Sequence, residues 1–148
     1  MRNLLLLGLL AIMATSCGLK GSGEAVKGPQ LLTVEFVGSQ DSTIKNNQGK
    51  VTLFAVPADV ADVKATVIDE VDFETSQLPF SVDFEIPVDH VTLIKPEVKE
   101  GGAVKYYVSM DWDSNADGKK DSMDVVIDYD KQFPNVDISE LHQQIFLK

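Results

Sequence analysis

The stretch that most constrains the fold is LPFSVDFEIP, residues 78–87. Its apolar residues alternate with polar ones, which is the period of an extended chain with one buried face. Pro79 and Pro87 bracket the run, as expected because proline cannot donate to a strand ladder. The pattern predicts a β-strand whose buried residues are Phe80, Val82, Phe84 and Ile86.

Similar runs, rich in β-branched and aromatic residues, recur along the chain with turn residues between them. The first two flank a polar loop that contains KNNQG, residues 45–49, so we expect them to form a hairpin. In the third run, Val63, Ala65 and Val67 are expected to share one face. The further strands are predicted at 31–37, 50–56, 62–68, 104–112 and 123–130.

The last segment, residues 137–148, fits two structures. Asp137 and Glu140 match a capping box and Leu141 and Ile145 have helical spacing, whereas an edge strand fits equally well. The remaining runs predict an all-β fold, an antiparallel β-sandwich of about seven strands that is immunoglobulin-like or similar. The 148 residues are enough for one domain with a buried core.

The first residues have the layout of a secretory signal peptide. Arg2 precedes an apolar run that is too short to span a bilayer, and small residues follow it up to Cys17. Residues 14–17, ATSC, resemble the bacterial lipobox, which implies a lipidated cysteine. A lone cysteine in an exported protein cannot form an internal disulfide, which agrees with lipidation. The alternative is ordinary cleavage near Ser16 with a free thiol.

The domain organisation follows from this leader. We predict a lipoprotein signal peptide at 1–16, a lipidated, glycine-rich tether at 17–30 and the β-sandwich at 31–148. Gly18 is not the aspartate that retains many lipoproteins in the inner membrane. The resemblance therefore implies a bacterial outer-membrane lipoprotein on the periplasmic or the surface-exposed side, anchored to the membrane through Cys17.

The formal net charge of -10 argues against nucleic acid, whose phosphates require a positive surface. Arg2 is the only arginine, and it lies in the leader. An acidic surface suits cations, basic partners or solubility.

Residues 110–127, MDWDSNADGKKDSMDVVI, carry the densest group of acidic residues. From Asp113 the order is Asp-x-Asn-x-Asp-Gly-x-x-Asp, which matches much of a calcium loop and offers the oxygen ligands that calcium needs. We predict a structural calcium site at the tip of a hairpin. Its expected ligands are Asp113, Asn115, Asp117, the carbonyl of Lys119, Asp121, Asp124 and Asp111.

This acidic segment resembles the calcium loops of integrin-type propellers, which share the Asp-x-Asn-x-Asp-Gly-x-x-Asp order and continue into an apolar strand. It does not resemble a regular EF-hand, because its flanks are strands. The alternative is an exposed hairpin loop without an ion, since Asp, Asn, Ser and Gly are common in turns.

The sequence contains no recognisable catalytic pattern. Its two histidines, His90 and His142, lie far apart, and we expect both on the surface or in loops. We expect Tyr106 and Trp112 in the core rather than on a sugar-binding surface. A hydrolase that uses paired carboxylates remains the enzymatic alternative.

Three stretches together resemble the YbaY/YscW-like lipoproteins, small β-sandwiches that include pilotins of secretion secretins. These stretches are VKATVIDEVDF (63–73), LPFSVDFEIP (78–87) and YYVSMDWDSNADG (106–118). The resemblance implies no catalytic residues and a binding or assembly role with another envelope protein. Strand addition at a sheet edge is the binding mode expected for such a role. A calcium-stabilised structural or surface module is the other alternative.

Overall fold

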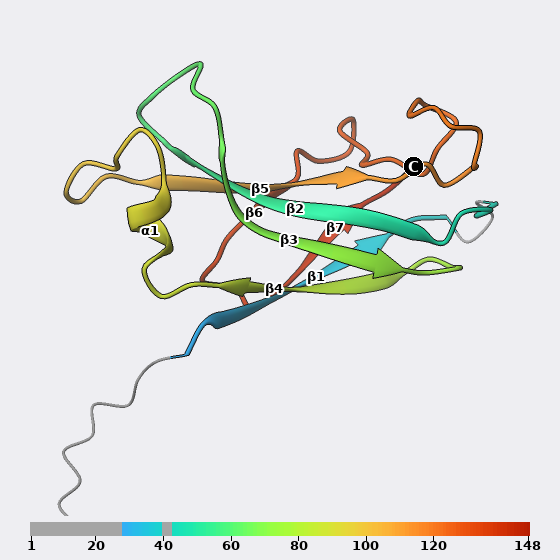
Figure 1. Ribbon diagram of the computed structural model, residues 1–148, viewed down its shortest axis with the longest axis horizontal. Coiled ribbons are helices and arrows are strands. Elements are labelled where there is room, and N and C mark those ends of the chain that lie inside the picture. Colours follow the sequence, from blue (N-terminus) through green and yellow to red (C-terminus); the bar gives the residue numbers. More distant parts are fainter. Residues whose placement is uncertain (1–27, 40–42) are drawn as a thin grey trace, which may run out of the picture.

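The computed structural model describes residues 28–39 and 43–148. They form seven strands in two sheets and one short helix (Figure 1). The elements are β1 (Gln30–Val37), β2 (Gln48–Pro57), β3 (Thr66–Glu74), β4 (Phe80–Ile86), α1 (His90–Leu93), β5 (Val104–Asp111), β6 (Asn135–Val136) and β7 (His142–Phe146). In the part of the chain described here, no helix is long and apolar enough to span a membrane.

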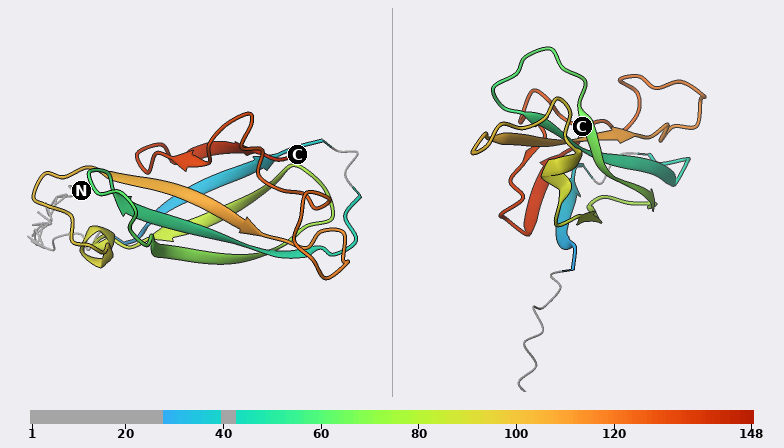
Figure 2. Two further views of the ribbon diagram at one scale, coloured as in Figure 1. Left: turned by 90° about the horizontal axis from the view of Figure 1, so that it is seen from above. Right: turned by 60° about the vertical axis from the view of Figure 1, so that its left-hand side comes forward.

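The two sheets pack face to face, which confirms the predicted β-sandwich (Figure 2). One sheet has the order β4-β1-β7 and the other the order β3-β2-β5-β6. All neighbours are antiparallel except β1 and β7, which are parallel. The predicted strand 78–87 corresponds to β4, and its inward side chains Val82, Phe84 and Ile86 are buried.

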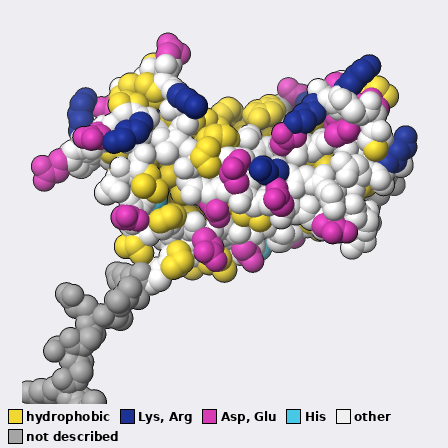
Figure 3. Space-filling view, in the orientation of Figure 1, with side chains coloured by type: hydrophobic (Ala, Val, Ile, Leu, Met, Phe, Trp, Pro, Cys, Tyr) yellow, Lys and Arg dark blue, Asp and Glu magenta, His cyan; other side chains and the backbone are white. Residues whose placement is uncertain are grey.

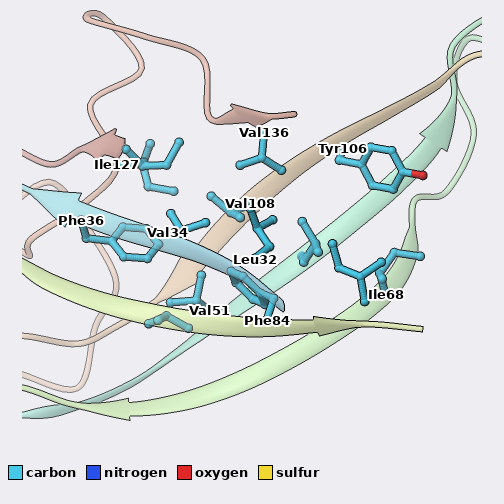
Figure 4. Packing of buried hydrophobic residues seen from close by; sticks show 14 of the residues in the cluster. Leu32, Val34, Phe36, Val51, Ile68, Phe84, Tyr106, Val108, Ile127 and Val136 are labelled. Carbon is cyan, nitrogen blue, oxygen red and sulfur yellow. The ribbon is translucent and has the colours of Figure 1, made fainter. Parts of the chain in front are cut away.

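The core lies between the sheets, where alternate residues of the long strands meet (Figure 4). One part of it is a cluster of aromatic rings, the buried cluster, in which the centroid of Phe80 lies 5.1 Å from that of Phe36 and 4.6 Å from that of Phe73. The Trp112 ring meets both Phe73 and Phe80 edge-on. A side chain at Gly49 would collide with the Phe73 ring, so this close packing requires glycine there.

The prediction that the first two strands form a hairpin is wrong. β1 pairs with β4 and β7, whereas β2 pairs with β3 and β5 in the other sheet. Because both strands bury alternate residues, they face each other across the core. The connection 38–47 is long enough to cross the roughly 10 Å between two packed sheets.

The third predicted strand, 62–68, is displaced. β3 begins only at Thr66, and a register irregularity opposite Leu53 and Phe54 leaves Ile68 without a partner in the ladder. This bulge turns Ile68 into the core while Val67 is exposed, contrary to the predicted face.

The run 123–130 is not a strand of either sheet, so the acidic segment is not the tip of a hairpin. Its backbone pairs instead with the last residues of the chain, since Val126 and Lys148 exchange two N–H to O hydrogen bonds and Ile127 bridges Leu147. Of the four alternating residues expected on one face of this run, Val125 and Ile127 are buried, whereas Met123 and Tyr129 are exposed. The alternating pattern of 123–130 therefore buries two side chains, although this run does not pair with β5 as the second strand of a hairpin.

The C-terminal segment forms β7, which settles the choice between helix and strand in favour of the strand. β7 lies beside β1 with Ile145 buried opposite Phe36. The strand predicted at 104–112 corresponds to β5. Tyr106 and Trp112, which were expected in the core, are buried.

Candidate functional site

The acidic loop, residues 112–124, follows β5 at the end of the sandwich opposite α1 (Figure 1). The two oxygens of Asp113 accept hydrogen bonds from the N–H groups of Asp117 (3.2 Å) and Gly118 (2.9 Å). The side-chain oxygen of Asn115 also accepts from the N–H of Asp117, at 2.9 Å. The loop is therefore folded by hydrogen bonds from its own backbone to its own side chains.

The backbone of this loop turns sharply at two residues in the left-handed region. Ala116 has φ 60° and Gly118 has φ 80°. Glycine adopts this conformation without steric cost, which explains the need for glycine at position 118. The turn places the side chains of Asp113, Asn115 and Asp117 on one short stretch of loop.

Asp124 closes the acidic loop from the inside and is only 5% exposed. Its carboxylate accepts from the backbone N–H groups of Asp121 (3.0 Å) and Asn115 (3.2 Å) and from the hydroxyl of Ser114 (3.4 Å). Burial opposes ionisation of Asp124, but these hydrogen bonds outweigh it and hold the pKa of the carboxyl below its ordinary value. The Ser114 hydroxyl also accepts the N–H of Val125 at 2.8 Å.

The other predicted ligands have partners of their own. Asp111 forms an ion pair with Lys120, and Asp121 accepts the N–H of Met123 at 2.8 Å. Lys119 donates its N–H to Asp117. Across 28–39 and 43–148, no group of three or more His, Cys, Asp or Glu side chains lies close enough together to hold a metal ion. Cys17 lies outside the described residues.

The polar loop before β2 anchors the acidic loop to the core. The Trp112 indole donates to the carbonyl of Asn46 at 2.8 Å, and the Asn46 amide donates to the carbonyl of Asp113 at 3.0 Å. The N–H groups of Lys45 and Asn46 both reach the carbonyl of Ser114. The buried tryptophan is thus the physical link between the buried cluster and the acidic loop.

A second feature lies on the outer face of the four-stranded sheet, where aromatic rings follow one another across the strands. Phe54 on β2 stacks on Tyr107 of β5 at 5.4 Å, and Tyr107 lies 6.2 Å from Phe133. Phe133 in turn meets Tyr129 at 6.0 Å. We call Phe54, Tyr107, Phe133 and Tyr129 the aromatic row. Both Phe133 and Tyr129 are 56% exposed.

The same outer face carries acidic side chains beyond the aromatic row. A depression of about 910 Å³ is lined by residues of β2, β3 and β5. Its carboxylates, Glu70, Asp72, Glu74 and Asp111, are all exposed. Lys50 lies about 4 Å from two of them, at the limit of an ion pair. The outer face therefore combines an apolar part with an acidic part.

Exposed carboxylates of this kind are poor candidates for a general acid. A catalytic acid needs a raised pKa, which proteins produce by burying the carboxyl group or placing it beside a second one in a site closed to water. The depression is open, and its carboxylates project from neighbouring strands into solvent. The hydrolase alternative gains no support from this geometry.

Single positions on both edges of the three-stranded sheet already have hydrogen-bond partners. The outer side of β7 is covered at its end, where the N–H of Asp128 donates to the carbonyl of Phe146. On β4, the outward N–H of Glu85 is taken by the carboxylate of Asp69 at 2.8 Å. Occupied positions of this kind disfavour pairing with another chain there.

The aromatic row was missed in the sequence because its members come from three separate segments. A signal was nevertheless present, since strict alternation places Tyr107 on the face opposite Tyr106. Tyr129 belongs to the strand predicted at 123–130, and Phe133 lies in the loop after it. Only the fold brings these two residues beside β5.

The two histidines lie on different elements and have different surroundings. His142 is exposed on β7. His90 is partly buried in α1, where its ring nitrogens lie 2.7 Å from the carbonyl oxygen of Pro87 and 2.8 Å from the hydroxyl of Tyr106. His90 thus has a structural contact that the sequence did not indicate.

Comparison with known proteins gives a likeness in structure but none in sequence. No family model and no curated protein matches the chain, so the YbaY/YscW-like resemblance stays a prediction. The chain is similar in structure to an alternative pilotin from the type II secretion system of Vibrio cholerae, with a TM-score of 0.49 and 16% sequence identity. The similarity covers 80% of this chain and 94% of the pilotin. Likeness of this degree carries no argument about function, which rests below on the residues themselves.

Proposed function

We propose that this protein is an outer-membrane lipoprotein, anchored through Cys17, whose sandwich is a non-catalytic binding or assembly module for another envelope protein. The observation that carries the proposal is the aromatic row. A cross-strand pair such as Phe54 and Tyr107 is explained by sheet stability alone. Phe133 and Tyr129, each more than half exposed, are not explained in this way.

The chemistry of the outer face favours a protein partner. Aromatic side chains are enriched at protein interfaces, where they bury a large area at a small cost in side-chain entropy. Neighbouring carboxylates add charge selectivity, because like-charged partners are repelled. We therefore expect a partner segment with apolar side chains flanked by lysine or arginine. Packing of side chains on this face, rather than strand addition, is the binding mode that the exposed rings of the aromatic row favour.

The membrane anchor has a direct test. Cells grown with labelled palmitate are expected to give a labelled protein in the outer-membrane fraction, and Cys17→Ser is expected to abolish the label. The Cys17→Ser variant also shows how much label or protein is found in the outer-membrane fraction through non-covalent association alone. An unlabelled wild-type protein in the soluble fraction would refute the anchor and would support ordinary cleavage near Ser16.

The binding role is tested by affinity capture from detergent-solubilised outer membranes. A binding or assembly module should return one envelope protein in stoichiometric amount. A structural or surface module should return none, and a hydrolase should return none while turning over a substrate. Repeating the capture at high salt tests the acidic part of the face, because screening should weaken a contact with basic side chains.

We also propose that the acidic loop binds calcium as a structural ion. The left-handed turn at Ala116 and Gly118 supports this, since it gathers the oxygens of Asp113, Asn115 and Asp117 on one short loop. Their present hydrogen bonds to backbone N–H groups would have to be exchanged for the ion.

Calcium binding is tested by thermal unfolding in millimolar calcium and in excess chelator. A ligand that binds only the folded state stabilises it by mass action, so calcium should raise the Tm by a few degrees. The matched variants are Asp113→Asn, which should remove the shift, and Asp72→Asn, which should keep it. Equal Tm values in calcium and chelator would contradict the proposal.

A further inference from the structure

At the α1 end of the sandwich, apolar side chains are exposed to solvent. Val88 is 62% exposed, Val91 42% and Leu93 46%, and all three belong to the segment between β4 and β5. Figure 3 shows hydrophobic side chains gathered near the place where the grey tail leaves the domain. Contiguous apolar surface on a folded domain indicates an interaction site.

This exposure is fixed by the fold. Ile94, which ends α1, is fully buried in the core. His90 is held between Pro87 and Tyr106, and the N–H of Lys95 donates to the hydroxyl of Thr66 on β3 at 2.9 Å. Both ends of α1 are thus held by contacts with the sandwich, and the three apolar side chains are exposed on a backbone of fixed position.

The chain enters the domain beside this surface. Gly28, the first described residue, lines a small depression of about 170 Å³ together with Pro87, Val88 and His90. Only residues 18–27 separate Gly28 from Cys17. A fully extended chain of this length spans at most about 40 Å, and a glycine-rich chain averages about 20 Å. A lipid on Cys17 therefore keeps this end of the sandwich close to the bilayer.

Two lysines at this end are paired with carboxylates, whereas the exposed side chains of Asp89 and Glu100 form no ion pair within the described part of the chain. Lys95 lies 3.3 Å from Glu97, and Lys99 lies 2.9 Å from Asp59. The depression lined by acidic residues and the acidic loop lie on other parts of the molecule. This end therefore approaches a negatively charged membrane with less repulsion than the rest of an acidic protein.

We propose that Val88, Val91 and Leu93 insert into the interfacial layer of the lipid bilayer that carries the anchor. The inference rests on the proposed lipid anchor at Cys17 and adds an orientation to it. Apolar side chains on a fixed frame gain by burial at the boundary of headgroups and acyl chains, and the anchor supplies the proximity that makes a small patch sufficient. The acidic loop then lies at the far end, away from the membrane.

The test places a spin label at Leu93→Cys or Val91→Cys in the full lipidated chain, reconstituted in vesicles of phosphatidylethanolamine and phosphatidylglycerol. The matched control is Met123→Cys, an exposed position in the acidic loop at the opposite end. Collision rates with oxygen, which prefers lipid, and with a water-soluble nickel chelate report depth. We expect the ratio of oxygen to nickel collisions to be at least threefold higher at positions 91 and 93 than at 123.

Three results would overturn the inference, and they are distinguishable. A chain that floats with the vesicles but gives the same aqueous ratio at 91, 93 and 123 keeps the anchor and refutes the insertion. A chain that does not float refutes both the anchor and the insertion. Labels at 91 and 93 that are immobile yet inaccessible to both reagents would assign this surface to contact with a second copy of the chain and would also overturn the inference. Two labelled positions keep the test decisive if one variant fails to fold.

Discussion

The molecule contains two aromatic clusters that differ in what surrounds them. The buried cluster of Phe36, Phe73, Phe80 and Trp112 lies between the sheets, where Phe80 meets Phe36 in its own sheet and Phe73 and Trp112 across the core. The aromatic row lies on one outer face, with nothing above Phe133 and Tyr129 in the described part of the chain. Similar side chains thus stabilise the fold in one place and remain free for a partner in the other.

The largest expected effect is in the buried cluster. Phe36→Ala removes a fully buried ring and leaves a cavity, so we expect the free energy of unfolding to fall by about 3–5 kcal/mol. Urea unfolding followed by tryptophan fluorescence measures the change, because Trp112 lies in the same cluster. A loss below about 1 kcal/mol would mean that the cluster does not support the fold as described.

An intermediate effect is expected at Asp124, whose carboxylate holds the acidic loop together from a buried position. Asp124→Asn replaces an acceptor of three hydrogen bonds by an amide that cannot accept all of them, and we expect a loss of about 1.5–3 kcal/mol at pH 7.

The pH dependence of this effect follows from the lowered pKa of Asp124. A carboxyl whose pKa is lower in the folded state stabilises the fold above its unfolded pKa of about 3.9. That stabilisation is lost as the pH falls through the folded pKa. The gap between wild type and Asp124→Asn should therefore narrow in urea unfolding at pH 3. A gap of equal size at pH 7 and pH 3 would contradict this account.

The smallest effect on stability is expected in the aromatic row. Tyr129→Ser and Phe133→Ser each remove a ring that is more than half exposed, so each should change the free energy of unfolding by no more than about 0.5 kcal/mol. Thermal or urea unfolding checks this value. If the free energy of unfolding fell as much as in Phe36→Ala, the aromatic row would be a structural cluster. It would then no longer support a binding role.

The two clusters also differ in how far the sequence predicts them. Alternation alone identified the buried residues of β4 and β5, because each strand has one dry face whatever its neighbours are. Strand pairing depends on contacts between distant segments, so the hairpin of the first two strands and the return strand at 123–130 were predicted wrongly. The aromatic row depends on the same long-range pairing and was missed. The acidic loop was located by its spacing, but its hydrogen bonds to Asn46 and Trp112 arise only from the fold.

The most direct test of the central claim is the affinity capture repeated with the double variant Tyr129→Ser/Phe133→Ser. The control is Leu141→Ser, which removes an apolar side chain directly before β7. Leu141 is 58% exposed, which is close to the exposure of Tyr129 and Phe133. We predict that the wild type and Leu141→Ser return the same envelope protein in equal amount and that the double variant returns at least tenfold less, although it is folded. Capture of that protein by the double variant in undiminished amount would contradict the assignment of the aromatic row as the binding surface.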